Sequence, residues 1–287
     1  MALTTLLVLL GLFAVGLITL VFQAALARGQ AKPSGEGLLI GLVTDFFDTL
    51  GIGNFAPTTA WFKFRKLLPD SHIPGTLNVG HALPVIVQSA IFLVLLGVEV
   101  DTTLLIGCVL AAVMGANLVV NAPVRSVQLI VGVALIIAAG LFAASNLGLM
   151  PAGGTASGLP LPLLILAIGV HFVLGILMAF GIGLYAPSLI LLSLLGLDPR
   201  LAFPIMTSCC AFLMPVSAIK FTASERISFP LVIGIMIGGI PAVLLAAYVV
   251  KELPMVWLRW GVVVVVLYAS ALLIRSALTK TSDQPAP

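Results

Sequence analysis

The sequence predicts an all-α polytopic membrane protein built from two inverted-topology repeats, and three observations lead to this prediction. Of the 287 residues, 61% are hydrophobic and only 8% are charged, and the mean hydropathy is +1.26; soluble domains carry roughly 25% charged residues. Apolar stretches near the roughly 20 residues that a bilayer crossing requires recur along the chain. A Gly-x-Gly motif closely followed by a proline occurs once in each half. We therefore expect the membrane to be the solvent of this protein, its elements to be helices, and each half to hold a re-entrant-like broken helix pair.

The first transmembrane helix is expected at residues 1–27. Small residues at Ala24 and Ala25 would suit a signal-peptide cleavage site. The apolar run at 3–26, however, has no basic residue before it and exceeds the usual length of about 7–15 residues. We interpret the segment as a retained helix.

Hydrophobicity divides the rest of the chain into repeat 1 (28–148), a linker (149–160), repeat 2 (161–278) and a C-terminal tail (279–287). Each repeat begins with a broken pair, which lies at 37–68 in repeat 1 and at 161–197 in repeat 2. Three further helices follow in each repeat, and we expect them at 75–97, 103–121 and 126–148 in the first and at 201–221, 228–250 and 255–278 in the second.

The two halves share a sequence motif at a constant offset. The segment Gly51-Ile-Gly-Asn-Phe-Ala-Pro-Thr58 matches Gly181-Ile-Gly-Leu-Tyr-Ala-Pro-Ser188, an offset of 130 residues (181 − 51). The match continues through pairs of prolines and threonines, with a one-residue insertion after the second pair: Pro69 with Pro199, Pro74 with Pro204, Thr76 with Thr207, and Pro84 with Pro215. Paired Gly/Pro interruptions at corresponding positions are the best sequence indicator of a transporter's binding site, because hydrocarbon penalises broken backbone unless it lines a polar cavity.

Basic residues predict the orientation. If each Gly-x-Gly is the tip of a hairpin, ten basic residues lie on one side: Arg28, Lys32, Lys63, Arg65, Lys66, Arg125, Lys220, Arg226, Arg275 and Lys280. The other side has Arg200, Lys251 and Arg259. The positive-inside rule makes the first side cytoplasmic, with the N-terminus outside and the C-terminus in the cytoplasm. Two full crossings per pair would give the same sides, so both arrangements remain open.

The sequence around the two Gly-x-Gly breaks resembles the sulfite exporter TauE/SafE family of membrane permeases. The resemblance rests on the two glycine-rich breaks, on the small or polar segments Thr76-Leu-Asn78 and Thr207-Ser-Cys209, and on the total length. The chain has Asn54-Phe55 and Leu184-Tyr185 where the family often has more glycine. The resemblance implies transport of a small sulfur-containing anion such as sulfite, thiosulfate or an organosulfonate.

Asp45 and Asp48 are the candidate proton-coupling residues. They lie three residues apart just before the first break, so on a helix they share a face. Carboxylates inside a membrane usually belong to a pathway or a proton relay. The alternative is that both lie near the membrane interface or pair with Lys63 or Arg65.

The candidate substrate-binding residues lie at and after the breaks. Free N–H groups at the helix starts could bind an anion; alternatively, glycine and proline only shape a hairpin that the hydroxyls cap. His81 either reaches the cavity or bonds a backbone carbonyl, and the later polar residues either line the cavity or promote helix packing. The full set is Gly51, Gly53, Asn54, Thr58, Thr76, Asn78, His81, Gly181, Gly183, Ser188, Thr207, Ser208 and Cys209. His171 is a weaker candidate.

The function expected from the sequence is a proton-coupled secondary transporter of the multi-pass type in a bacterial plasma membrane. Its partners are a small anionic substrate, protons and the lipid bilayer; nucleic acid is not expected, and a homodimer stays open. No nucleotide-binding loop is present, Cys108, Cys209 and Cys210 lack metal-binding spacing, and we expect neither a cofactor nor a metal. We do not expect an enzyme, because no HExxH or GxSxG motif occurs. A membrane-embedded enzyme and a passive anion channel are the alternatives.

Overall fold

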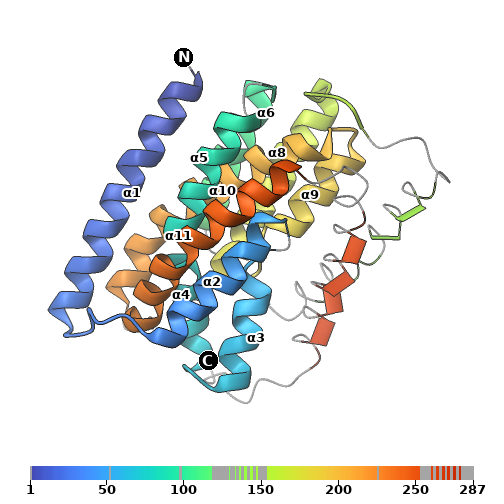
Figure 1. Ribbon diagram of the computed structural model, residues 1–287. Coiled ribbons are helices and arrows are strands. Elements are labelled where there is room, and N and C mark those ends of the chain that lie inside the picture. The colour runs from blue at the N-terminus through green and yellow to red at the C-terminus, as the bar shows by residue number, and fades with distance from the viewer. Residues whose placement is uncertain are drawn as a thin grey trace.

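The computed structural model is helical throughout the part of the chain that it describes, which is residues 2–51, 53–96, 99–117, 154–224 and 226–252 with single positions between 129 and 147 and between 260 and 278. The expected helices at 126–148 and 255–278 lie outside the continuous ranges. The helices are α1 (Ala2–Ala27), α2 (Gly35–Thr49), α3 (Phe55–Arg65), α4 (Ile73–Gly80), α5 (Ala82–Leu96), α6 (Thr102–Asn117), α8 (Leu161–Ala179), α9 (Tyr185–Leu194), α10 (Pro199–Ala223) and α11 (Phe229–Glu252), with a 3₁₀ turn at Asp70–His72 (Figure 1).

Among the residues that the structure describes, five helical segments are long and apolar enough to cross a membrane. They are Leu3–Ala27, Ile73–Leu95, Leu161–Ala179, Pro199–Ala223 and Phe229–Tyr248. The first lies along one side of the bundle (Figure 1), and only 17% of its most apolar window is buried within the protein, against 89% for α10. The expected all-helical fold is therefore confirmed over the described residues, and these five helices are candidates to span a membrane, with α10 in the interior and α1 on the periphery.

Hydrogen bonds between connecting segments define two ends of the bundle. At the first end, the Ser34 N–H donates to the carbonyl of Pro230, and the Ser228 N–H donates to the Thr76 hydroxyl. At the second end, the Asp101 N–H donates to the carbonyl of Ser157, the Ala156 N–H donates to that of Gly196, and the Asp198 N–H donates to that of Ala156. Because α2 starts at the first end and the segment after α3 returns there, this helix pair enters and leaves on one side.

The second helix pair has the opposite placement. α8 begins beside the Ser157 segment, and the residues after α9 bond back to Ala156, so this pair enters and leaves at the second end. The backbone between α2 and α3 passes through positive φ at Gly51 (94°) and Gly53 (82°), and the segment between α8 and α9 does so at Gly181 (83°). Glycine adopts this region without the steric cost that a Cβ imposes, so the glycines allow the chain to reverse within a few residues.

Close packing through glycine joins α2 to α11. A Cβ on Gly37 would lie 2.8 Å from the backbone oxygen of Leu231, and one on Gly234 would lie 2.6 Å from that of Ser34. Gly115 of α6 and Gly175 of α8 similarly face each other's helix backbone. Small residues that let helix backbones approach are typical of membrane helix interfaces, and here they hold each broken pair to a helix from the other half of the chain.

The expected single helix at 75–97 is divided at His81 into α4 and α5. Pro84 has no N–H to donate to the carbonyl four residues earlier, at Gly80, and a proline ring crowds that turn. The other helical hydrogen bonds around this position are present, because the His81 N–H donates to the carbonyl of Leu77 and the Val85 N–H donates to the carbonyl of His81. The interruption places the imidazole of His81 at a bend inside the bundle.

Candidate functional site

The two helix breaks contact each other in a reciprocal manner. A Cβ on Gly53 would lie 3.7 Å from the Cβ of Tyr185, and a Cβ on Gly183 would lie 3.6 Å from the Cβ of Phe55. In the sequence match between the halves, Gly53 corresponds to Gly183 and Phe55 to Tyr185. The two contacts therefore join the same pair of matched positions in both directions. The segments that the sequence singled out for their glycines thus meet inside the bundle.

A buried hydrogen-bond network starts at Asp45. Its Oδ1 accepts from the Asn54 amide at 2.8 Å and lies 2.8 Å from Nδ1 of His81. Nε2 of the same imidazole lies 3.0 Å from the Thr58 hydroxyl. The Asp45, Thr58 and His81 side chains are fully buried, and Asn54 is 4% exposed. Four predicted site residues, separated by up to 36 positions, therefore form one network.

The network has two protonation patterns. With a neutral imidazole and an ionised Asp45, the Nδ1–H donates to the carboxylate and Nε2 accepts from the Thr58 hydroxyl. With an imidazolium, both ring nitrogens donate, and the Thr58 oxygen becomes the acceptor. One hydroxyl rotation converts the first pattern into the second, so the same arrangement of heavy atoms fits a neutral or a charged imidazole.

Asp48 lies in a second polar group, one turn along α2 from Asp45. Its neighbours are the backbone N–H of Asn54 and the side chains of Tyr185 and Gln88. The Tyr185 hydroxyl donates to Oε1 of Gln88 at 2.9 Å. Among the described residues, the two carboxylate oxygens of Asp48 and Nε2 of Gln88 have no hydrogen-bond partner within normal geometry. Both side chains are nevertheless fully buried.

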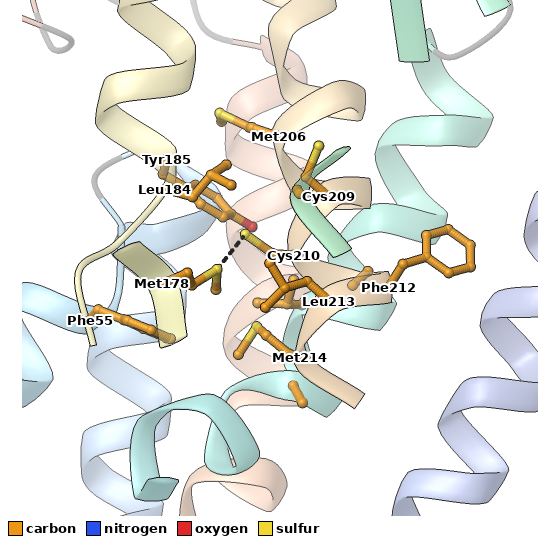
Figure 2. Close-up of a cluster of buried hydrophobic side chains, with 14 of the residues drawn as sticks. Phe55, Met178, Leu184, Tyr185, Met206, Cys209, Cys210, Phe212, Leu213 and Met214 are labelled. Atoms are coloured by element: carbon orange, nitrogen blue, oxygen red, sulfur yellow. Dashed lines mark hydrogen bonds between the residues drawn. The ribbon is translucent and has the colours of Figure 1, made fainter. Parts of the chain in front are cut away.

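Sulfur-containing side chains line the same region. The thiol of Cys210 donates to the sulfur of Met178 at 3.6 Å, and Figure 2 shows the Tyr185 hydroxyl directed toward Cys210, with Cys209 turned away from that contact. Cys210 lies near Asp48, whereas Cys209 lies near Cys108 and Cys210. The predicted residue Cys209 thus lies outside the polar group, and its neighbour Cys210 borders it.

The second half has its own pair of a histidine and a hydroxyl. Nε2 of His171 lies 2.9 Å from the Ser188 hydroxyl, and its Nδ1 lies 2.8 Å from the carbonyl of Ala167. A carbonyl only accepts, so Nδ1 carries the hydrogen, and a neutral imidazole then accepts from Ser188. Ser188 and Thr58 are equivalent repeat positions, but only the first-half histidine faces a carboxylate.

The remaining predicted residues lie apart from these networks. Asn78 donates to the carbonyls of Pro74 and Met178, at 2.9 and 3.1 Å, and so joins α4 to α8. The Ser208 hydroxyl lies 3.0 Å from that of Ser89. Thr207 donates to Phe203 in its own helix, and Thr76 accepts from the chain at the first end of the bundle. These four side chains are buried, and their bonds connect or cap helices.

The proposed pairing of the aspartates with Arg65 does not occur. Arg65 instead bonds Glu36 at 2.9 Å, and Trp61 donates to the same carboxylate at 3.2 Å. The bond from Arg65 lowers the pKa of Glu36, so this exposed pair is intact at neutral pH and weakens as acidification protonates the carboxyl. Both Asp45 and Asp48 are fully buried within the protein.

Sequence reasoning missed the partners Tyr185, Gln88 and Cys210. Gln88 is the single amide in the apolar run 82–96, and that isolation is a signal that could have been used. Tyr185 occupies the repeat position of Phe55, so its hydroxyl is the one chemical difference between the halves there. Within the described ranges, no three His, Cys, Asp or Glu side chains come together as metal ligands.

Comparison of the chain with known protein families, with curated proteins and with solved structures finds no match.

Proposed function

We propose that this protein is a secondary transporter in which two inverted repeats move a small sulfur-containing anion, coupled to protons. The single observation that carries the proposal is the buried polar network at the junction of the two helix breaks. Buried ionisable groups are costly in a membrane protein and typically belong to a transport path. A fold that needed only stability would have apolar side chains at Asp45, Asp48 and His81.

Reciprocal packing supports the inverted repeats. At an offset of 130 residues, α2 corresponds to α8 and α6 to α11. α2 packs on α11, and α8 packs on α6, which is the same contact with the two halves exchanged. The two broken pairs enter from opposite ends, as inverted repeats require. Alternating access would then move one half against the other around the contact between Gly53 and Tyr185.

The starts of α3 and α9 support an anionic substrate. Neither N-cap residue, Asn54 or Leu184, caps its helix through a side chain, so the first N–H groups of each helix keep their capacity to bind an anion. The resemblance to sulfite exporters suggests which anion is transported, namely a sulfur-containing one such as sulfite, thiosulfate or an organosulfonate. The Asp45–His81 pair and Asp48 supply groups that can carry protons.

Orientation follows from the two ends of the bundle. Arg28, Lys32, Arg65, Lys66 and Arg226 belong to the first end, and Arg200 belongs to the second. The positive-inside rule favours a cytoplasmic first end. We accordingly propose a multi-pass protein of a bacterial plasma membrane with its C-terminus in the cytoplasm.

One observation favours a second candidate, a membrane-embedded hydrolase. The Thr58 hydroxyl lies 3.0 Å from Nε2 of His81, and Nδ1 of His81 lies 2.8 Å from Oδ1 of Asp45. In a hydrolase, this arrangement would make Thr58 the nucleophile, His81 the base and Asp45 the group that orients the base. A hydroxyl-reactive fluorophosphonate tests this candidate, with Ser188→Ala as the control because its histidine faces a carbonyl. Labelling that is lost in Thr58→Val and kept in Ser188→Ala would favour the hydrolase.

A thermal-shift screen of the detergent-purified protein tests the proposal, because a ligand that binds the folded state raises its apparent stability. The probes are sulfite, thiosulfate, taurine, sulfoacetate, sulfate and chloride. We expect one sulfur anion to raise the melting temperature selectively, and Asn54→Ala to remove that shift. Asn117→Ala is the matched control, because the Asn117 amide bonds Val113 in its own helix. No shift with any probe would contradict the substrate class.

A further inference from the structure

The two aspartates of the candidate site differ in how many donors reach them. Asp45 Oδ1 is bound by the Asn54 amide and faces His81 Nδ1, both at 2.8 Å. Asp48 has no hydrogen-bond partner within normal geometry among the described residues, yet it is fully buried. Oδ1 of Asp45 thus has two nitrogen partners while its Oδ2 has none, whereas both oxygens of Asp48 lack a partner although the Asn54 N–H, Tyr185 and Gln88 lie beside them.

No charged side chain from the described elements compensates Asp48. The titratable groups that face it are Asp45 on its own helix, Tyr185 of α9 and Cys210 of α10; α5 contributes the uncharged Gln88. His81, at the α4–α5 bend, is engaged by Asp45. Every Lys and Arg whose side chain the structure describes is exposed. An ionised Asp48 would therefore be a buried charge without a counter-ion, which is strongly unfavourable.

The polar partners beside Asp48 are bonded to each other. The Tyr185 hydroxyl donates to Gln88 Oε1 at 2.9 Å, while Gln88 Nε2 has no acceptor among the described residues. Both donors could turn to an ionised carboxylate, but in this arrangement they do not. The arrangement is the one expected around a neutral carboxylic acid.

We propose that Asp48 is the residue that binds the coupled proton, that Tyr185 and Gln88 stabilise it after the proton leaves, and that Asp45 serves to position His81. This inference rests on the proposed transport function and identifies the ion-binding residue within it. A proton adds to a carboxylate oxygen of Asp48 to form an O–H bond, and on release it passes to water on the open side. The Tyr185 O–H and the Gln88 Nε2–H then donate to the carboxylate, and the Tyr185–Gln88 bond breaks.

The switch links the two halves of the protein. Asp48 precedes the first break, whereas Tyr185 is the first residue of α9 and contacts Gly53. When the Tyr185 hydroxyl exchanges Gln88 for Asp48, the contact between the two breaks must adjust. Proton occupancy thereby biases the relative position of the halves, which is what coupling requires.

Infrared difference spectroscopy on a pH jump tests this inference without a substrate, using the full-length protein in liposomes. A protonated carboxylic acid has a carbonyl-stretch band that an ionised carboxylate lacks. We expect this band to decrease at alkaline pH, to be lost in Asp48→Asn and to persist in Asp45→Asn. Tyr185→Phe should shift the band, and Phe55→Tyr is the control at the equivalent position of the other break.

Three results would overturn the inference: a band lost in Asp45→Asn and kept in Asp48→Asn, no titrating band in the wild type, or a band that responds to sodium and not to pH. Asp48→Asn should be folded, because an amide resembles the neutral acid in shape; Asp48→Glu keeps a carboxylic acid and should retain a shifted band if the asparagine variant is unstable. Failure of transport with an intact Asp48 band would contradict the proposed function and leave the proton site standing.

Discussion

Thr58 and Ser188 occupy equivalent positions in the two halves, and each hydroxyl lies within 3.0 Å of the Nε2 atom of a histidine. The histidines come from different places, at the α4–α5 bend in the first half and within α8 in the second. The environment of Nδ1 then separates them: a carboxylate for His81 and a backbone carbonyl for His171. Equivalent hydroxyls thus bond a histidine that faces a carboxylate in one half and a histidine that faces a backbone carbonyl in the other.

Thr58→Val removes the partner of His81 and keeps the shape of the side chain. We expect the free energy of unfolding to fall by about 1–3 kcal/mol, because a buried imidazole nitrogen loses its hydrogen bond. Chemical denaturation in detergent measures the change. Thr58→Ser keeps the hydroxyl and loses one methyl group, so it should cost only about 0.8 kcal/mol. Equal losses for the two variants would contradict the role of the hydroxyl.

Spacing in the sequence was enough to identify Asp45, Asp48, Asn54, Thr58 and His81, because carboxylates and amides are conspicuous in apolar segments. It did not reveal which of them bond, since a helix face gives direction but not the partner across the bundle. Gln88 and Tyr185 were missed for the same reason: their importance comes from the neighbour that tertiary packing brings to them.

At the scale of the helices, the Gly-x-Gly motifs predicted the ends of α2 and α8 and the starts of α3 and α9. The broken pair expected at 37–68 is observed as Gly35–Thr49 and Phe55–Arg65. The residues between the two helices include Gly51 and Gly53, whose positive φ does not fit a helix. The division of the 75–97 helix was not predicted, because a proline inside a membrane helix often bends it without ending it.

The two motifs look alike in sequence but differ in backbone conformation. Gly53 has a φ of 82°, whereas Gly183, its repeat equivalent, lies outside the positive-φ region. Gly53→Ala should therefore destabilise the protein by about 1–2 kcal/mol, and Gly183→Ala should be close to neutral, since its added Cβ would meet Phe55 at an ordinary 3.6 Å. Thermal unfolding of both variants measures the difference. Equal destabilisation would contradict the conformational asymmetry of the breaks.

At the scale of the whole molecule, the sequence predicted the membrane class from composition alone, and the five long apolar helices agree with it. The inverted repeat was suggested by one motif at a fixed offset. The packing that supports it, with α2 on α11 and α8 on α6, could not be read from periodicity, because apolar helices with small residues on several faces have no unique partner.

Orientation can be tested with single cysteines at the two ends. The native Cys108, Cys209 and Cys210 are buried, so a membrane-impermeant thiol reagent should react only with introduced sites. We expect Ser157→Cys to be labelled in intact cells, and Gln30→Cys only after the membrane is opened. Both positions are exposed. The reverse pattern would contradict a cytoplasmic first end, and labelling of both in intact cells would contradict a membrane-spanning bundle.

The central claim is that the polar network between the two breaks supports proton-coupled transport of a sulfur anion. Uptake of radiolabelled sulfite and thiosulfate into proteoliposomes under an imposed pH gradient tests it most directly. We expect saturable accumulation of one anion against its concentration gradient. Collapsing the pH gradient should abolish this accumulation, and Asp48→Asn should make uptake insensitive to the gradient. Absence of accumulation under either polarity of the gradient, or uptake that is neither saturable nor dependent on pH, would contradict it.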